Sequence, residues 1–399
     1  MKKIFNKTFA IIKNTIIFLF GFLLGRSKKS IIFGAWMGDK FADNSRFLFQ
    51  YLSDNKNDLQ LDNIVWATRS VDVYNTLKKM NYHTVLIGTK ESFYWHCKSG
   101  IHIVCNTQID GKIYRSDIDT SLSCGALKIQ LWHGNGIKCV PGDTRTSHNF
   151  VIRFLKNIST PGLWYVGNYY FLCKCDLDFY FFEKKFMADR DHCIDSAYPR
   201  TQPCIRYYGE EQELITSLSQ FNKIILFLPT FRNSYKNYIH PLQEDDLISY
   251  FEENNYLWIE KPHAADKESK TILNRNSTNI LTLDSTFDIN VLMPFIDILV
   301  TDYSSAMLDA MFFRKQIVYY VPDFEYYIKD DRGFIIDYDS VCINPKVMNI
   351  DELKDALQNA INKHTYDENA ENIRSMFWKY DDWSYKEIWN SIIKHCNVE

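Results

Sequence analysis

The sequence predicts an α/β protein made of two Rossmann-like domains, and three observations support this prediction. Short apolar runs suited to buried strands alternate with helix-length segments. The alternation occurs twice, in two halves of similar size. The chain has 399 residues, 46% of them apolar and 24% charged, which suits a globular protein with two cores of ordinary size. We therefore expect two parallel sheets, one in each domain, that face each other across a cleft.

The first series defines an N-terminal domain, which we place at residues 30–210. The expected strands are 30–36, 63–68, 83–88, 101–106 and 127–133, and the first expected helix is 44–54. The pattern weakens between about residues 141 and 210, where aromatic side chains are frequent and Tyr198-Pro199-Arg200 predicts a turn.

The second series defines a C-terminal domain, which we place at residues 211–399. The expected strands are 222–231, 256–262, 279–284, 296–302 and 316–322, and the expected helices are 241–254 and 305–313. Neither half carries the glycine pattern of a dinucleotide-binding loop or of a P-loop between a strand and a helix. A dehydrogenase and a P-loop kinase are therefore disfavoured.

Residues 1–29 form a basic and apolar segment that we expect to associate with a membrane. An uncharged run of 12 residues, 14–25, is flanked by Lys2, Lys3, Lys7, Lys13, Arg26, Lys28 and Lys29. A spanning helix needs about 20 apolar residues, so a helix lying on anionic lipid fits better. A secretory signal is disfavoured because Lys28 and Lys29 occupy the place of the cleavage site. A helix packed on its own domain is the remaining alternative.

Charge and cysteine content bear on the possible partners. The net charge of -3 gives no reason to expect a nucleic-acid partner, which usually selects a clear basic excess. The ten cysteines contain no CxxC pair, so they suit neither a zinc framework nor a disulfide-stapled domain. We interpret them as reduced thiols of a cytosolic protein and expect no metal.

The stretch KIQLWHGNGIK places His133, Gly134 and Lys138 at the end of an expected strand. Open α/β sheets bind ligands at such ends, and glycine lets a ligand approach the backbone closely. A hydrogen-bonded histidine in an ordinary turn is the alternative interpretation.

Polar residues also follow the strands of the second half. Thr230 and Arg232 follow one strand, and Lys261 and His263 follow the next. The planar donor fork of arginine suits phosphate, although an exposed arginine after a strand is commonplace. A lone histidine usually has a structural role, but a histidine close to a lysine at a strand end favours a role in a functional site.

The segment IDILVTDYSSAMLDAMFF predicts a strand, a polar turn and a helix. Ser304, Ser305 and the first free amides of that helix would form an anion site, and Asp302 or Ser304 would also cap the helix. Arg332, in a later loop, offers another cationic contact.

Together these segments are more specific than any one alone. They are FADNSRFLFQYL (41–52), HGxxxK (133–138), PTFR (229–232), KPH (261–263), TDYSSAMLDA (301–310), YYVPDFEYY (319–327) and RGF (332–334). In this order they resemble the CDP-glycerol glycerophosphotransferase family, which includes teichoic acid primases and polymerases and related capsule polymerases. The resemblance covers about residues 30–385.

This resemblance implies a GT-B-like architecture in which the second domain holds most of the donor. It implies transfer of a polyol phosphate, glycerol phosphate first, from a CDP-linked donor to a hydroxyl of a lipid-linked or polymeric acceptor, with release of CMP. The implied catalytic residues are His133, as general base, and His263. The implied donor contacts are Thr230, Arg232, Lys261, Ser304, Ser305 and Arg332, and the implied acceptor or cleft residues are Gly134 and Lys138.

The chemistry is consistent with these roles. Histidine titrates near neutral pH, which suits removal of a hydroxyl proton. Helix amides, Arg232 and a protonated His263 would stabilise the departing CMP, so no metal or cofactor is required in principle. The implied location is the cytoplasmic face of the cell membrane, with a peripheral or shallow anchor.

The chain departs from the family pattern in its first half. Asn135-Gly136 stands where members often carry Thr-Pro, and Ala197-Tyr198-Pro199-Arg200-Thr201-Gln202 lacks the glycine and aspartate of a common GxPRxD segment. The acceptor is therefore less defined than the donor. A glycosyltransferase that uses a nucleotide sugar and a non-catalytic nucleotide-binding scaffold are the alternatives.

Overall fold

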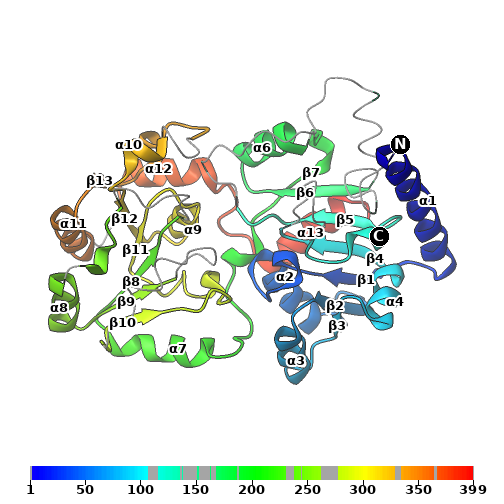
Figure 1. The fold of residues 1–399 in the computed structure, drawn as a ribbon, viewed down its shortest axis with the longest axis horizontal. Coiled ribbons are helices and arrows are strands. Elements are labelled where there is room, and N and C mark those ends of the chain that lie inside the picture. The colour runs from blue at the N-terminus through cyan, green and yellow to red at the C-terminus, as the bar shows by residue number, and fades with distance from the viewer. Residues whose placement is uncertain are drawn as a thin grey trace. The chain divides into compact units, whose positions relative to one another are not determined.

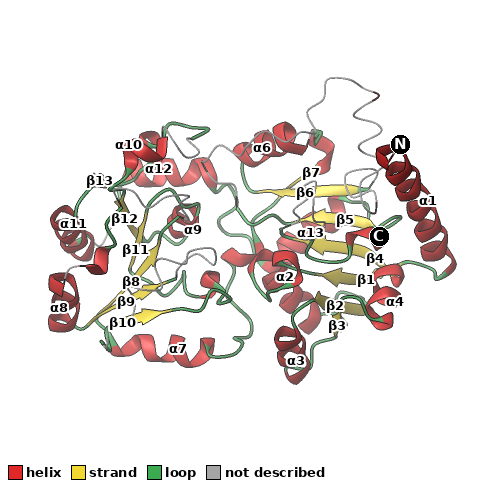
Figure 2. Cartoon of the chain, viewed as in Figure 1, coloured by secondary structure: helices red, strands yellow, loops and turns green. Residues whose placement is uncertain are grey.

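The computed structural model divides the chain into two compact units, drawn in Figure 1. Unit 1 comprises Met1–His133, Gly142–Tyr208 and Lys379–Glu399, and unit 2 comprises Gly134–Pro141 and Gly209–Trp378. The residues that the structure describes are 2–106, 116–134, 137, 151, 162, 168–186, 188–230, 238–243, 245–261, 277–328, 334–363 and 366–398. Each unit is built on one parallel sheet with helices as crossovers, so the predicted α/β class is confirmed (Figure 2).

Unit 1 has a seven-stranded sheet with the order β3-β2-β1-β4-β5-β6-β7, and its strand pairs are parallel. Its strands are β1 (Ser27–Phe33), β2 (Asn63–Thr68), β3 (Thr84–Leu86), β4 (Ser99–Val104), β5 (Leu127–Gln130), β6 (Tyr169–Cys173) and β7 (Cys193–Asp195). Its helices are α1 (Lys2–Leu23), α2 (Asp43–Asp54), α3 (Val71–Lys79), α4 (Lys90–Lys98), α6 (Asp176–Phe186) and α13 (Tyr385–His395). The strand order reverses between β1 and β4, and such a switch point is where open sheets bind ligands.

Unit 2 repeats this plan with a six-stranded sheet in the order β10-β9-β8-β11-β12-β13. Its strands are β8 (Lys223–Leu228), β9 (Tyr256–Glu260), β10 (Ile280–Thr282), β11 (Ile298–Thr301), β12 (Gln316–Tyr320) and β13 (Lys346–Val347). Its helices are α7 (Glu211–Ser217), α8 (Asp245–Asn254), α9 (Ala306–Phe312), α10 (Phe324–Tyr326), α11 (Ile350–Asn362) and α12 (Glu368–Phe377). The switch point of this sheet lies between β8 and β11.

The strands are almost continuously apolar because helices cover both faces of a parallel sheet. In β11, Ile298 and Val300 join a buried core with Leu353 and Leu357 of α11 and Phe251 of α8. Figure 1 shows α8 and α11 on one side of this sheet and α9 on the other.

The core of unit 1 combines aliphatic residues with an aromatic cluster. Phe171 of β6 stacks on Phe182 and Phe186 of α6, with ring centroids 4.6 and 5.2 Å apart. Trp132, just beyond β5, packs against the same two α6 rings at 5.5 Å each. This cluster accounts for the aromatic residues in the stretch where the strand pattern of the sequence weakens.

Helix α1 packs on unit 1 through a narrow stripe made of Asn14, Ile17 and Gly21. Most of its other described apolar side chains are exposed. Arg26, after the helix, donates four hydrogen bonds of 2.7 to 2.9 Å to backbone carbonyls of unit 1. Within the described ranges, no helix has the length and apolarity to cross a membrane.

The structure differs from the sequence prediction in three strands and in the end of the second domain. Strands β6, β7 and β13 were not predicted. The expected domain 211–399 differs from unit 2 at its end, because residues 379–399 belong to unit 1. There α13 contacts β7 and buries Ile388, Trp389 and Ile392. The C-terminal segment therefore completes the first unit.

Replacing Trp389 with alanine should destabilise unit 1 selectively. Trp389 is 2% exposed, and removal of such a side chain costs about 3 to 5 kcal/mol. Hydrogen exchange of the backbone amides should accelerate in β6 and β7 and stay unchanged in β8 and β11. The control Met376→Ala changes a side chain that is 60% exposed, so its effect should stay within about 0.5 kcal/mol. Equal acceleration in both sheets would contradict the assignment of α13.

Candidate active site

Three predicted site residues of unit 2 follow three neighbouring strands. Thr230 comes two residues after β8, Lys261 directly follows β9, and Ser304 comes three residues after β11. Because β8 lies between β9 and β11 and all three are parallel, these residues gather at one edge of the sheet. Four other predicted site residues, Lys138, Arg232, His263 and Arg332, lie outside the described residues.

Asp302 ties the ends of β8 and β11 together at the switch point. Both of its carboxylate oxygens accept the backbone N–H of Thr230, at 2.9 and 3.0 Å. One of them also accepts the N–H of Tyr303, at 2.6 Å. The Tyr338 hydroxyl donates to the Asp302 carbonyl at 2.8 Å. Asp302 is 1% exposed, so it is a structural anchor of this edge.

Ser304 and Ser305 stand between β11 and α9, and both are partly exposed. The Ser304 hydroxyl oxygen accepts the N–H of Ala306, the first residue of α9, at 3.3 Å, but Ser304 itself precedes the N-cap position. Ser305 occupies the N-cap position without a capping hydrogen bond from its side chain. Partly exposed hydroxyls beside the first turn of a helix are suitable donors to an anion.

An aromatic cluster packs around the turn between β11 and α9. Tyr303 is fully buried and stacks on Tyr327 with ring centroids 3.8 Å apart, and its hydroxyl donates to Asp323 at 3.0 Å. Phe334 and Tyr338 pack on it at 5.8 Å each. The motifs YYVPDFEYY and RGF therefore contribute packing around the serine turn, which their sequence pattern alone does not reveal.

Glu260 and His240 form a buried pair next to Lys261 that the sequence analysis missed. Glu260, the last residue of β9, lies 3.5 Å from the Nε2 atom of His240 and is 2% exposed. Burial raises the pKa of the Glu260 carboxyl to about 7, while hydrogen bonds from Trp258 and Thr282 lower it. A carboxyl with such a pKa near a strand end is a functional candidate. Its position in an ordinary apolar strand gave no sequence signal.

In unit 1, the structure places His133 three residues beyond the end of β5. The chain turns at Trp132, whose φ of 61° lies in the left-handed region, and Gly134 follows with a φ of 109°. Trp132 is buried in the aromatic core, and His133 is only partly buried. The turn thus fixes one aromatic residue in the core and presents the next residue at the sheet edge.

The hydrogen bond of His133 determines which ring nitrogen is the base. Its Nδ1 atom lies 3.0 Å from the backbone carbonyl oxygen of Cys105, which follows β4. A carbonyl can only accept, so Nδ1 carries the proton and Nε2 is the basic nitrogen of the neutral ring. The ring also lies 4.5 Å from the ring of Trp132 and 5.7 Å from that of Trp36, between centroids.

Two motifs from distant parts of the sequence meet behind His133. The Asn44 amide nitrogen donates to the Trp132 carbonyl at 2.8 Å, and its oxygen accepts the N–H of Arg200 at 3.1 Å. The Arg200 guanidinium pairs with Asp43 at 2.7 Å, and both side chains are buried. The Asp43-Asn44 pair and the Pro-Arg turn thus hold the backbone next to His133, although the turn lacks the flanking residues of GxPRxD.

Comparison with known proteins decides the family. The family model for CDP-Glycerol:Poly(glycerophosphate) glycerophosphotransferase matches residues 16–394. The chain belongs to this family.

Individual members of this glycerophosphotransferase family extend the comparison. The chain is 28% identical over 399 residues to the teichoic acid poly(glycerol phosphate) polymerase of Bacillus spizizenii, covering 94% of this chain and 92% of the relative. It is 24% identical over 352 residues to the teichoic acid glycerol-phosphate transferase of Staphylococcus aureus, covering 83% and 84%. The structure of the wall teichoic acid polymerase TagF matches 100% of each chain with a TM-score of 0.70 at 19% identity, which shows a shared fold.

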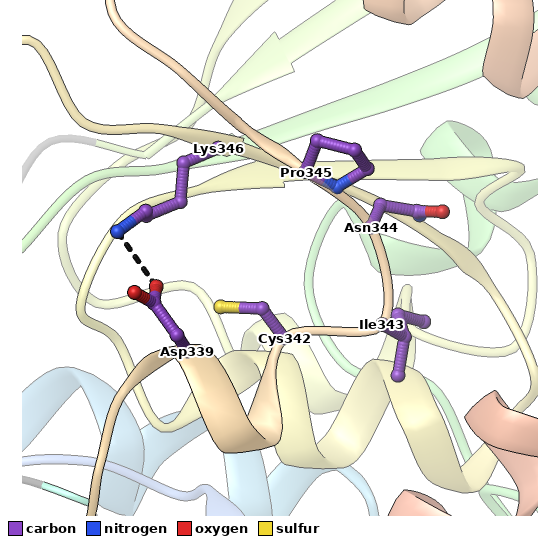
Figure 3. Close-up of a pocket in the computed structure, with 6 residues that line it drawn as sticks. All are labelled: Asp339, Cys342, Ile343, Asn344, Pro345 and Lys346. Carbon is purple, nitrogen blue, oxygen red and sulfur yellow. Dashed lines mark ion pairs between the residues drawn. The ribbon is translucent and has the colours of Figure 1, made fainter.

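None of the predicted site residues is among those that line the pocket in Figure 3. It is lined by Asp339, Cys342, Ile343, Asn344, Pro345 and Lys346. Lys346 and Asp339 point toward each other and pair at 2.6 Å, and the Lys346 ammonium also lies 3.7 Å from the centre of the Phe324 ring. The described part of the chain contains no group of three or more His, Cys, Asp or Glu side chains able to hold a metal ion.

Replacing Glu260 with glutamine should change the pH dependence of stability. The pKa of Glu260 is higher in the folded protein than its ordinary value, so the folded state binds the proton more tightly. Its contribution to stability is present below about pH 4.5 and is lost as the pH rises through about 7. Relative to wild type, Glu260→Gln should therefore gain about 2 kcal/mol between pH 5 and pH 8, measured as thermal unfolding midpoints.

The control for this prediction is Glu253→Gln, which changes an exposed carboxyl of α8. Its unfolding midpoint relative to wild type should not depend on pH. A Glu260→Gln variant that tracks wild type at both pH values would show that Glu260 titrates normally.

Proposed function

We propose that this protein transfers a polyol phosphate, with glycerol phosphate as the first candidate, from a CDP-activated donor to a hydroxyl of a lipid-linked or polymeric acceptor. Membership of the glycerophosphotransferase family supports this reaction class. The observation that carries the mechanism is the hydrogen bond from His133 Nδ1 to the Cys105 carbonyl, because it leaves Nε2 as the base. The product is an acceptor extended by one polyol phosphate in a teichoic-acid-like or capsular polymer.

The reaction needs one proton transfer and one displacement at phosphorus. Nε2 of His133 takes the proton of the acceptor hydroxyl while its oxygen attacks the phosphorus of the polyol phosphate. A new P–O bond forms to the acceptor, and the P–O bond to CMP breaks. CMP leaves with the electron pair of that bond, and the proton stays on the imidazole until solvent removes it.

The donor is assigned to the carboxyl edge of the unit 2 sheet. Thr230, Lys261, Ser304 and Ser305 lie at this edge, and in our proposal Arg232, His263 and Arg332 add positive charge to it. Such donors stabilise the charge that develops on the departing CMP. This assignment requires neither a metal nor a cofactor. Gly134 and Lys138, which follow the base, are assigned to the acceptor or the cleft.

A lipid-linked acceptor would be reached most easily by a protein bound to the membrane. We propose that α1 contacts the lipid. Its described apolar side chains include nine that are 38% to 79% exposed, namely Phe9, Ile11, Ile12, Ile16, Phe18, Leu19, Phe20, Phe22 and Leu23. Lys13 is exposed on the same helix, and Lys28 and Lys29 are exposed shortly after it. An apolar helix with basic flanks lies in the interface of anionic lipid. We therefore place the protein at the cytoplasmic face of the cell membrane, peripherally bound.

His133→Ala should abolish transfer. CMP release by the full-length protein from CDP-glycerol or CDP-ribitol, with a lipid-linked acceptor, should fall by about 10² to 10⁴-fold because the general base is lost. The control His395→Gln changes a histidine on α13 that bonds the Asp191 carbonyl, and it should keep wild-type rates. Wild-type activity in His133→Ala would contradict the assignment of the base. Turnover of a nucleotide sugar, and of no CDP-polyol, would favour a glycosyltransferase instead.

Replacing Phe22 and Leu23 together with serine should weaken membrane binding. These side chains are 76% and 79% exposed, so the folded protein does not depend on them for its core. Sedimentation with phosphatidylglycerol vesicles should show at least about a tenfold loss of binding, because two apolar contacts with lipid disappear. Met376→Ser, a change at an exposed site of unit 2, is the matched control and should bind like wild type. Unchanged binding of the double variant would rule out the α1 surface.

A further inference from the structure

Asp117 is a buried carboxylate of unit 1 that the assigned reaction does not use. It is fully buried and precedes β5 in the chain. Its Oδ1 atom accepts the backbone N–H of Met37 at 2.8 Å. Its Oδ2 atom accepts the N–H groups of Cys105 and Asn106, at 2.8 and 2.6 Å. One carboxylate therefore holds both the loop after β1 and the end of β4.

One of these bonds leads directly to the proposed base. The N–H of Asn106 and the carbonyl of Cys105 belong to the same peptide group. That N–H donates to Asp117, while that carbonyl accepts the Nδ1 proton of His133. The carboxylate, the peptide group and the imidazole thus form one continuous chain of hydrogen bonds.

We propose that Asp117 is a positioning residue that acts on His133 through the Cys105–Asn106 peptide group. It fixes the carbonyl that orients the imidazole, and it stabilises the imidazolium that forms when His133 takes the acceptor proton. This inference rests on the proposed function, in which His133 is the general base.

Hydrogen-bond cooperativity gives the physical reason. A carboxylate bound to the N–H of a peptide polarises that peptide, so its carbonyl becomes a stronger acceptor for Nδ1. A stronger acceptor favours the charged ring, which raises the basicity of Nε2. In a Ser-His-Asp triad the carboxylate touches the histidine directly. Here one peptide group intervenes, so the expected effect is smaller.

The second oxygen of Asp117 acts on the other side of the ring. Trp36, whose ring lies near His133, and Met37 have φ values of 46° and 60°, which are unfavourable for residues with side chains. The loop keeps this conformation because Asp117 holds the Met37 N–H and Arg69 donates to the Met37 carbonyl at 2.6 Å. Asp117 therefore secures both the carbonyl and the indole that border the imidazole.

Several charged or titratable groups surround the chain of hydrogen bonds from Asp117 to His133. Burial raises the pKa of Asp117 to about 7, the three N–H groups lower it, and Asp43 at the start of α2 raises it. Arg69 donates to the carbonyl of Ser116, next to Asp117, and Lys40 lies over the Trp36 ring. The Cys105 thiol faces Asp117 and Asp43, and its pKa is raised by burial. Asp117 therefore titrates near pH 7 and is mostly ionised above it.

The test compares the His133 pKa in wild type and in Asp117→Asn. Nitrogen-15 NMR of histidine-labelled full-length protein reads this pKa without any substrate. Loss of the carboxylate should lower it by about half a unit, and the acidic limb of the kcat/KM profile should move by the same amount. The maximal rate should fall about tenfold.

The matched control is Arg69→Lys, which loosens the same loop but keeps its charge and does not touch the Cys105–Asn106 peptide. It should leave the His133 pKa unchanged even if its rate falls. A merely structural role of Asp117 predicts equal behaviour of the two variants. If His133→Ala is inactive and Asp117→Asn keeps the wild-type His133 pKa, the inference is overturned while the proposed function stands. If His133→Ala is fully active, both are overturned.

A second variant keeps the inference testable if Asp117→Asn does not fold. Coupling between two titrating groups is reciprocal. Replacing His133, a partly buried residue, with glutamine should therefore raise the pKa of Asp117 by about the same half unit. Carbon-13 NMR of the Asp117 carboxyl measures this shift. An Asp117 pKa that is identical in wild type and His133→Gln would overturn the inference.

Discussion

The candidate site depends on how the ends of two neighbouring parallel strands are held at each switch point. Where the strands separate, their backbone N–H groups lose their ladder partners and need others. In unit 2 the buried carboxylate of Asp302 accepts the N–H of Thr230, after the neighbouring strand. In unit 1 the buried carboxylate of Asp117 accepts three such groups. Each unit thus stabilises the carboxyl ends of the strands at its switch point with an aspartate.

The side chains that we propose for the chemistry are only partly buried. His133, Ser304 and Ser305 reach the surface, whereas the residues that hold their backbone are inaccessible. A buried carboxylate is costly unless hydrogen bonds satisfy it, and here the bonds come from backbone that must be fixed in any case. Loss of either aspartate would therefore disturb the backbone that it holds at the end of its sheet.

The sequence predicted local elements well and long-range contacts poorly. The expected strand 63–68 coincides with β2, because a parallel strand buried on both faces is a continuous apolar run. Strand β5 is shorter than expected, because the left-handed turn at Trp132 ends it before His133. Asn44 and Arg200 lie in quoted motifs, but their contact with each other was not predicted, because they are far apart in sequence. Asp117 gave no local pattern at all, because its partners are also far away in sequence. Strands β6 and β7 were missed because aromatic packing, rather than alternation, defines that region.

The return of α13 to unit 1 makes unit 2 an insertion within the first unit. During synthesis, every residue of unit 2 is made before α13, the helix that contacts β7. Unit 1 therefore cannot complete its contacts until unit 2 has been synthesised in full, which departs from the usual order in which the N-terminal domain folds first. The residues that begin unit 1 and those that complete it are thus separated in time by the synthesis of a whole second unit.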